Sequence, residues 1–133
     1  LICTNTNFSD CIVKIIIPIE SFDSGNSGRD SNMLFHVESN KFPFVKFSSN
    51  SFDINKIINK KINLNGVLDF HGNNKDILTS VEIFVKDSLL YGEAKFSISL
   101  EAYNVKRPQL LFVPISDEII IESKIYCDNI FIK

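Results

Sequence analysis

The sequence INLNGVLDFHGNNKDILTSVEIFV at residues 62–85 decides the fold, because it holds two alternating apolar and polar patterns on either side of a turn. In the first half, apolar residues recur at every second position, as in a strand with one buried face. The turn contains GNN at 72–74, residues that tolerate positive φ. Alternation resumes at Ile77 and continues to Val85, so the stretch predicts an antiparallel hairpin with one apolar face.

Similar alternation predicts four further strands, at residues 11–20, 44–52, 91–103 and 117–129. In the first of them, Ile12 and Ile16 lie opposite the main apolar set, which indicates a strand covered at least partly on both faces. In the third, the alternation places Ala102 inward and Tyr103 outward, and a tight connection at residues 87–88 precedes it. The chain therefore has several long strands with one apolar side each.

The connections are less regular than the strands. Residues 21–31 are rich in Gly, Ser, Asp and Asn and predict a loop, which is followed by one helical turn at 31–35 with Asp30 or Ser31 as its N-cap. Residues 53–61 fit either a hairpin loop or a helical turn. The segment after the third of these strands carries the apolar run LLFV at 110–113, and we expect it to fold over an opening or onto the core.

No stretch of useful length has helical periodicity, so we predict an all-β class: an antiparallel barrel with one short helical turn, in one domain spanning residues 1–133. The content of 44% hydrophobic residues suffices for a core, and closure removes the edges that long strands would otherwise expose. Several inward residues are small and leave room inside the barrel: Gly66, Gly92, Ala94, Ala102 and Ser123.

Composition argues against several classes of function. The formal net charge is −2 and the lysines are scattered, so we expect no nucleic-acid partner. No apolar run is long enough for a membrane-spanning helix. His36 and His71 are separated and lack a third ligand, so we predict no metal site, and no phosphate-binding or dinucleotide-binding spacing calls for a cofactor.

The number and spacing of the three cysteines argue against a disulfide scaffold. Cys3, Cys11 and Cys127 are few and widely spaced, and our interpretation is that they are small buried hydrophobic residues. The alternative is a bond between Cys11 and Cys127 if their strands are neighbours in an oxidising compartment.

Catalysis would need converging polar groups, and one pair is the best candidate. Asp69 and His71 share the polar face of one strand and could orient each other for acid–base chemistry. Such a pair is more often a solvated edge, so we predict no catalytic residues and keep an enzyme only as an alternative.

Three segments together resemble the YceI-like family: residues 24–30 with Ser-Gly-Asn and Arg-Asp, residues 41–49 with Lys-Phe-Pro, and residues 66–75. The third is similar to the family's Gly-x-Leu-Thr-x-x-Gly-x-x-Lys pattern, with Asp69 in place of Thr. A further departure is Asn32, where a His commonly follows the Arg-Asp pair.

The resemblance implies a lipocalin-like barrel whose apolar channel binds a polyisoprenoid, in bacterial proteins that are periplasmic or secreted. It implies a non-enzymatic carrier or store of an isoprenoid or quinone. Arg29 and Asp30 either meet the lipid head group or fix their loop. The residues expected to line the channel are Val13, Ile15, Ile17, Phe47, Leu64, Leu68, Phe70, Val81, Ile83, Phe96, Ile98, Leu100, Ile119 and Ile121.

Two alternatives remain open from the sequence. The family's opening strands are reduced ahead of Cys11, so residues 1–8 are a remnant strand, a second copy completes the sheet as a homodimer, or the barrel stays open. Periodicity alone also favours inward side chains that fill the interior, which would make the protein an interaction module instead of a lipid carrier.

Overall fold

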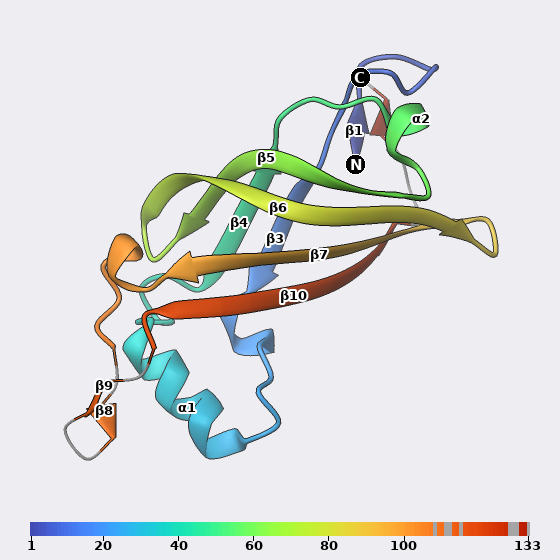
Figure 1. Ribbon diagram of the computed structural model, residues 1–133. Coiled ribbons are helices and arrows are strands. Elements are labelled where there is room, and N and C mark those ends of the chain that lie inside the picture. Colours follow the sequence, from blue (N-terminus) through green and yellow to red (C-terminus); the bar gives the residue numbers. More distant parts are fainter. Residues whose placement is uncertain (108, 111–112, 115, 128–130, 133) are drawn as a thin grey trace.

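A six-stranded antiparallel sheet that curls into a half-barrel dominates the computed structural model, which describes residues 1–107, 109–110, 113–114, 116–127 and 131–132 (Figure 1). The strand order is β10-β7-β6-β5-β4-β3. The strands are β3 (Lys14–Pro18), β4 (Phe44–Ser49), β5 (Lys60–Phe70), β6 (Asn73–Lys86), β7 (Leu89–Ser99) and β10 (Glu118–Cys127). The predicted all-β, lipocalin-like class is confirmed.

Shorter elements lie at the two ends of the half-barrel. One end carries a small sheet in the order β11-β1-β2, and Figure 1 shows α1 at the opposite end. The small sheet comprises β1 (Ile2–Cys3), β2 (Cys11–Ile12) and β11 (Phe131–Ile132). The other elements are α1 (Ser27–His36), α2 (Ile54–Ile57), β8 (Gln109–Leu110), β9 (Val113–Pro114) and the 3₁₀ turns η1 (Ile19–Ser21) and η2 (Glu101–Tyr103).

The hairpin between β5 and β6 has the predicted strands and a turn one residue earlier than predicted. Phe70 pairs with Asn73, so His71 and Gly72 form the two-residue turn, with φ of 52° and 71°. Positive φ at both positions matches the twist of the flanking strands, and Asn73 is left free to pair. The expected connection at residues 87–88 has the same form, with both residues at positive φ.

The predicted loop at residues 21–31 is wrong over its last part, because α1 already begins at Ser27. The side chain of Asn26 caps the helix by accepting a hydrogen bond from the Arg29 N–H at 2.9 Å. The Asp30 carboxylate accepts from the backbone N–H of Ser24 at 3.0 Å and from its hydroxyl at 2.5 Å. The helix is therefore ten residues long instead of a single turn.

Two expectations about inward and outward faces are also wrong. Ile16 on β3 is 64% exposed, so the reverse face of that strand is uncovered there, whereas Ile12 on β2 is half-buried. The strand expected at 91–103 ends at Ser99, where the Asp117 carboxylate accepts from the Ser99 hydroxyl and the Glu101 N–H. The chain turns there into η2, so Tyr103 is buried while Ala102 is exposed.

The sheet stays open between β3 and β10, since neither pairs with the other within the described ranges. The remnant at the N-terminus is the two-residue strand β1, which belongs to the small sheet. The expected placement of the apolar run at 110–113 rests on residues 111 and 112, which lie outside the described residues. The part of the chain that the structure describes thus forms a half-barrel.

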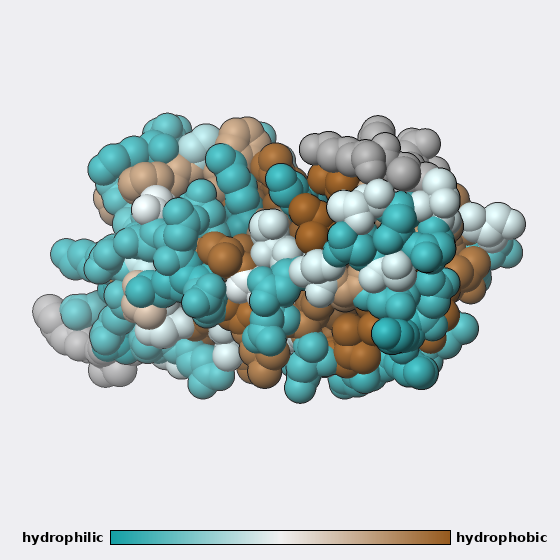
Figure 2. All heavy atoms as spheres, turned by 90° about the horizontal axis from the view of Figure 1, so that it is seen from above, coloured by the Kyte–Doolittle hydropathy of each residue, from teal (hydrophilic) through white to brown (hydrophobic). Residues whose placement is uncertain are grey.

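The outer face of the sheet is mixed in character. Val67 on β5 and Leu78 on β6 are exposed there. Figure 2 shows hydrophobic residues reaching the surface among hydrophilic ones on the face seen from above. Single exposed apolar residues are normal on protein surfaces, so we assign no site to them.

The two strand glycines provide a matched test of packing. A Cβ at Gly66 would lie 2.5 Å from the Phe47 ring and 2.6 Å from the Ser48 carbonyl oxygen, whereas a Cβ at Gly92 would meet nothing within 4 Å. We expect Gly66→Ala to lower the free energy of unfolding by about 1 to 3 kcal/mol through overpacking. Gly92→Ala should leave it unchanged or raise it slightly. Urea denaturation of both variants measures this, and equal effects would contradict the packing described.

Asp117 should make stability depend on acid pH. Hydrogen bonds from the Ser99 hydroxyl and the Glu101 N–H hold the pKa of Asp117 below its usual value. The carboxylate therefore contributes stability that is fully present above the unfolded pKa of about 3.9 and is lost as pH falls through the lower folded pKa. We expect the stability advantage of the wild type over Asp117→Asn at neutral pH to shrink at about pH 3.

Urea denaturation at both pH values measures the effect. Asp76→Asn, which removes an exposed carboxylate on β6, controls for the loss of a surface charge. An advantage over Asp117→Asn that stays constant with pH would show that the Asp117 hydrogen bonds do not stabilise the folded state.

Candidate binding cavity

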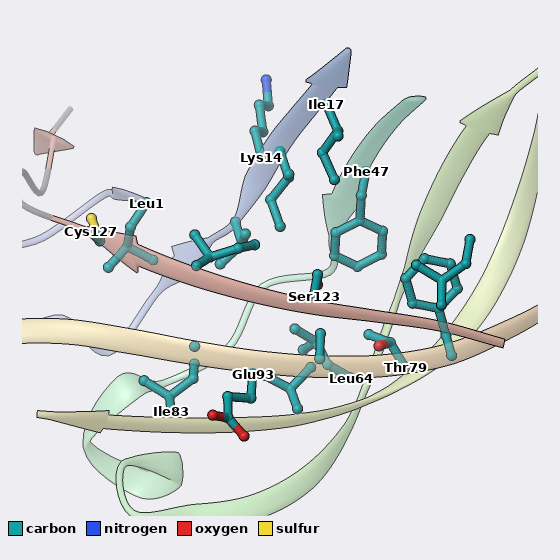
Figure 3. A pocket seen from close by; sticks show the side chains of 18 of the residues that line it. Leu1, Lys14, Ile17, Phe47, Leu64, Thr79, Ile83, Glu93, Ser123 and Cys127 are labelled. Carbon is teal, nitrogen blue, oxygen red and sulfur yellow. The ribbon is translucent and has the colours of Figure 1, made fainter. Parts of the chain in front are cut away.

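An apolar cavity of about 230 Å³ lies on the inner face of the half-barrel. All six strands of the large sheet contribute to its lining, and Figure 3 shows side chains from β3 and β4 facing those from β7 and β10 across it. The volume is slightly below the range of about 300 to 1,000 Å³ that is typical of drug-sized ligand pockets. A cavity of this size suits one slender molecule.

Ten of the fourteen residues predicted to line a channel do line this cavity. Nine of them lie at inward positions of the six strands of the large sheet, and Val13 directly precedes β3. The ten residues are Val13, Ile15, Ile17, Phe47, Leu64, Leu68, Val81, Ile83, Phe96 and Ile121. The period of two was the signal that identified them.

The structure corrects the placement of the other four. Phe70, Ile98 and Leu100 are buried in the core, and Ile119 packs against it, so these side chains fill one end of the half-barrel. They contact groups from outside the sheet, including Tyr103, whose ring centre lies 5.5 Å from that of Phe70. The sequence pattern gave no sign of this, because it shows which face a residue takes and not what lies opposite.

Other lining residues were missed by sequence reasoning. The alternation of the strands could have identified four of them, Val45, Ile77, Leu90 and Ile125. Two others, Leu1 and Phe22, come from segments outside the large sheet. Figure 3 shows Leu1 beside Cys127 at one end of the cavity. No periodic signal connects these segments, so only the fold reveals their contribution.

The empty space comes from small residues on β7 and β10. Gly92, Ala94 and Ser123 all line the cavity, as the sequence suggested. The space beside Gly66, in contrast, is filled by the ring of Phe47, and Ala102 lies on the surface. Three of the five small residues expected to leave room therefore do so.

The inner surface carries little polarity. The Thr79 hydroxyl is 3.3 Å from the Lys95 carbonyl oxygen, to which it donates a hydrogen bond. Lys14, Glu93 and Tyr126 are the exposed lining residues, and Figure 3 shows the Lys14 amine and the Glu93 carboxylate directed away from the apolar side chains. Such a surface selects a ligand by length and girth, since it offers few polar groups to recognise chemical identity.

His71 lies at the filled end and holds three segments together. Its Nδ1 is 2.9 Å from the Tyr103 carbonyl oxygen and its Nε2 is 2.7 Å from a carboxylate oxygen of Glu38. Its ring centre is 4.7 Å from that of Phe42. A carbonyl oxygen only accepts, so Nδ1 carries a proton and donates, and an imidazolium donates to both partners.

The interpretation of Asp69 and His71 as a solvated pair is therefore wrong for His71, which is 8% exposed. His71 belongs to the turn and not to the strand, so the alternation does not determine its direction. Its contacts are structural and link the loop after α1 to η2. In the described part of the chain, no hydrogen bond joins it to Asp69.

Arg29 and Asp30 lie in the first turn of α1 and do not line the cavity. Asp30 fixes the preceding loop through Ser24, as one of the two predicted roles requires. The Arg29 side chain is exposed.

Two other kinds of feature are absent from the described part of the chain. Among the described residues, no three His, Cys, Asp or Glu side chains gather in a way that could hold a metal ion. None of the helices described here is long and apolar enough to cross a membrane.

The curled antiparallel sheet with an apolar interior defines the class of lipocalin-like half-barrels. The family model of the YceI-like domain matches residues 3–126, and the chain belongs to the YceI-like family. A search of curated protein sequences found no match.

Solved structures share the fold. The YCEI protein of Campylobacter jejuni is 19% identical with a TM-score of 0.66, over 92% of this chain and 81% of that one. BcnA of Burkholderia cenocepacia is 19% identical with a TM-score of 0.68, over 86% and 72%. A polyisoprenoid binding domain from Saccharophagus degradans, implicated in plant cell wall breakdown, is 14% identical with a TM-score of 0.59, over 76% and 62%.

A disulfide between Cys3 and Cys11 anchors the small sheet near the cavity. The expectation of three buried thiols is wrong for these two residues, and so is the alternative bond between Cys11 and Cys127. β1 and β2 pair directly, which places Cys3 opposite Cys11, whereas Cys127 lies on β10 opposite Leu90 and lines the cavity. Strand pairing across a short loop, which the spacing did not indicate, decided the partner.

Reduction should destabilise the protein measurably. The bond joins residues eight apart, and closing a loop of that length stabilises by about 2 to 3 kcal/mol. We expect a reductant to lower the melting temperature of the wild type and of Cys127→Ser alike. The double variant Cys3→Ser, Cys11→Ser should melt at the lower temperature and not respond to reductant. A response in the double variant would contradict the assigned pairing.

Proposed function

We propose that this protein binds one slender apolar lipid, of the isoprenoid or quinone type, in the cavity of the half-barrel and carries or stores it. The observation that carries the proposal is an unfilled, nearly uncharged cavity inside a sheet whose inner residues would otherwise be expected to meet. Burying a lipid tail there contributes about 0.8 kcal/mol per CH₂ group before ordering costs.

Membership of the YceI-like family supports the ligand class, as does the likeness to a domain whose description names polyisoprenoid binding. A non-enzymatic role fits the polar groups present. His71 is engaged by Glu38 and Tyr103 at the filled end, and neither hydrogen bond involves Asp69. The cavity itself offers apolar contacts and no converging acid and base among the described residues.

An oxidising compartment, periplasmic or extracellular in a bacterium, is part of the same proposal. Disulfides form and persist there and are rare in reducing cytosol. The bond between Cys3 and Cys11 supports this location, and the family resemblance agrees with it.

A second candidate is an interaction module that pairs its sheet edges, with a homodimer completing the sheet. The observation in its favour is the pair of edge strands β3 and β10, which carry the exposed residues Ile16 and Ile120. Unpaired edges are templates for strand addition. Light scattering of the purified protein distinguishes a dimer from a monomer, and lipid extraction shows whether either form is loaded.

Blocking the cavity should abolish lipid binding without harming the fold. Gly92 faces open space in the cavity, so Gly92→Leu adds a side chain where the ligand would lie. We expect at least about a tenfold loss of affinity for geranylgeraniol, measured by displacement of a hydrophobic fluorescent probe. Ser97→Leu, on the exposed face of the same strand, is the matched control and should bind like the wild type.

Extraction of the protein from its native host provides an independent measurement. We expect organic solvent to release a stoichiometric polyprenyl or quinone species that mass spectrometry identifies. Repeated empty extracts, together with equal probe displacement in both variants, would refute the lipid-binding proposal.

A further inference from the structure

The boundary between filled and empty interior falls at the same level on the neighbouring strands β7 and β10, and the lining of β5 changes near the same end. On β5 the last inward residue that lines the cavity is Leu68, which also belongs to the buried core, and the next, Phe70, lies in that core outside the lining. On β7 the corresponding pair is Phe96 and Ile98, and on β10 it is Ile121 and Ile119. The strand register places Ile121 opposite Phe96 and Ile119 opposite Ile98, so β7 and β10 change at the same level.

The filled end is a firmly closed floor. Phe70, Ile98 and Leu100 are each 7% exposed or less, and Tyr103 packs with them. The hydrogen bonds of His71 to Glu38 and to the Tyr103 carbonyl fix the turns around this core. A ligand cannot pass such a core without displacing side chains packed at the density of a protein interior.

Beyond the floor the half-barrel stays open, because the edge strands β3 and β10 do not pair with each other within the described residues. Leu1 and Cys127 line the end away from the floor, and Figure 3 shows them side by side there. On β10 the lining extends from Ile121 to Cys127, six residue steps, which corresponds to about 20 Å of strand. The floor therefore bounds this lined length at one end, and the unpaired edges leave the cavity open beyond it.

We propose that the cavity admits a prenyl chain, apolar end first, to a depth of about four isoprene units, because each unit adds about 5 Å of extended chain. This depth limit rests on the proposed function and deepens it. Chains up to that length are held whole, and the remainder of a longer chain stays outside the cavity. The protein then distinguishes short prenyl chains by length and does not distinguish among long ones.

Pairwise competition among prenols tests the limit. Delipidated protein is offered equimolar pairs from cyclodextrin, and mass spectrometry of the re-isolated protein gives the bound ratio. We expect farnesol to outcompete geraniol, and geranylgeraniol to outcompete farnesol, by about tenfold or more per unit, because each added unit is buried. Solanesol should outcompete geranylgeraniol by less than about threefold, since its extra units remain outside.

Two variants move the limit in opposite directions and control for unequal release from cyclodextrin. Ile98→Ala opens the floor and should shift the ratio towards solanesol. Ser123 lies at mid-depth on β10, so in Ser123→Leu the preference for the longer prenol should stop at a shorter chain length. Lys124→Leu, on the opposite face, should leave all the bound ratios unchanged. If Ile98→Ala fails to fold, Ser123→Leu and its control still decide the question.

The outcomes separate the two proposals. The depth limit would be overturned, and lipid binding left standing, by either of two results. One is a preference of tenfold or more for solanesol over geranylgeraniol in the wild type, and the other is a set of bound ratios that Ser123→Leu does not change. Failure of every prenol to bind would overturn the proposed function together with the limit.

Discussion

The packed end of the half-barrel is the constraint on which the rest of the structure depends. Phe70 and Leu100 come from the sheet and its continuation, while Ile19, Val37 and Tyr103 come from segments beyond it, and together they bury a common core. Apolar burial of this kind stabilises the curl of a sheet whose two edge strands do not pair in the described part of the chain. An empty cavity elsewhere is tolerable because this core holds the strands in place.

Polar contacts fix the segments that the strand pattern does not govern. Asp117 ends β7 and starts η2, Asp30 holds the loop before α1, and His71 ties the β5–β6 turn to Glu38 and Tyr103. The contacts of Asp117 and His71 join residues that are distant in sequence, and the contact of Asp30 lies within an irregular loop. They set where the core can form, and so they set where the cavity ends.

Local pattern predicted most of the sheet. Strands, inward faces and the tight turn at residues 87–88 follow from a period of two and from turn chemistry, both of which act over a few residues. The start of α1 was missed because Asn26 caps it within a Gly- and Ser-rich stretch typical of a loop. The Cys3–Cys11 bond was missed because it depends on the pairing of two very short strands.

The sequence by itself determined the all-β class, the YceI-like motifs and which side chains point inward, since these depend on spacing along the chain. Only the tertiary structure decided which inward positions are filled. Gly66 and Gly92 are both glycines on the inner face of the sheet, yet Gly66 lies under the ring of Phe47 and Gly92 faces empty space. Phe47 lines the cavity while Phe70 closes it. What lies opposite an inward residue comes from distant parts of the chain, and spacing carries no record of that.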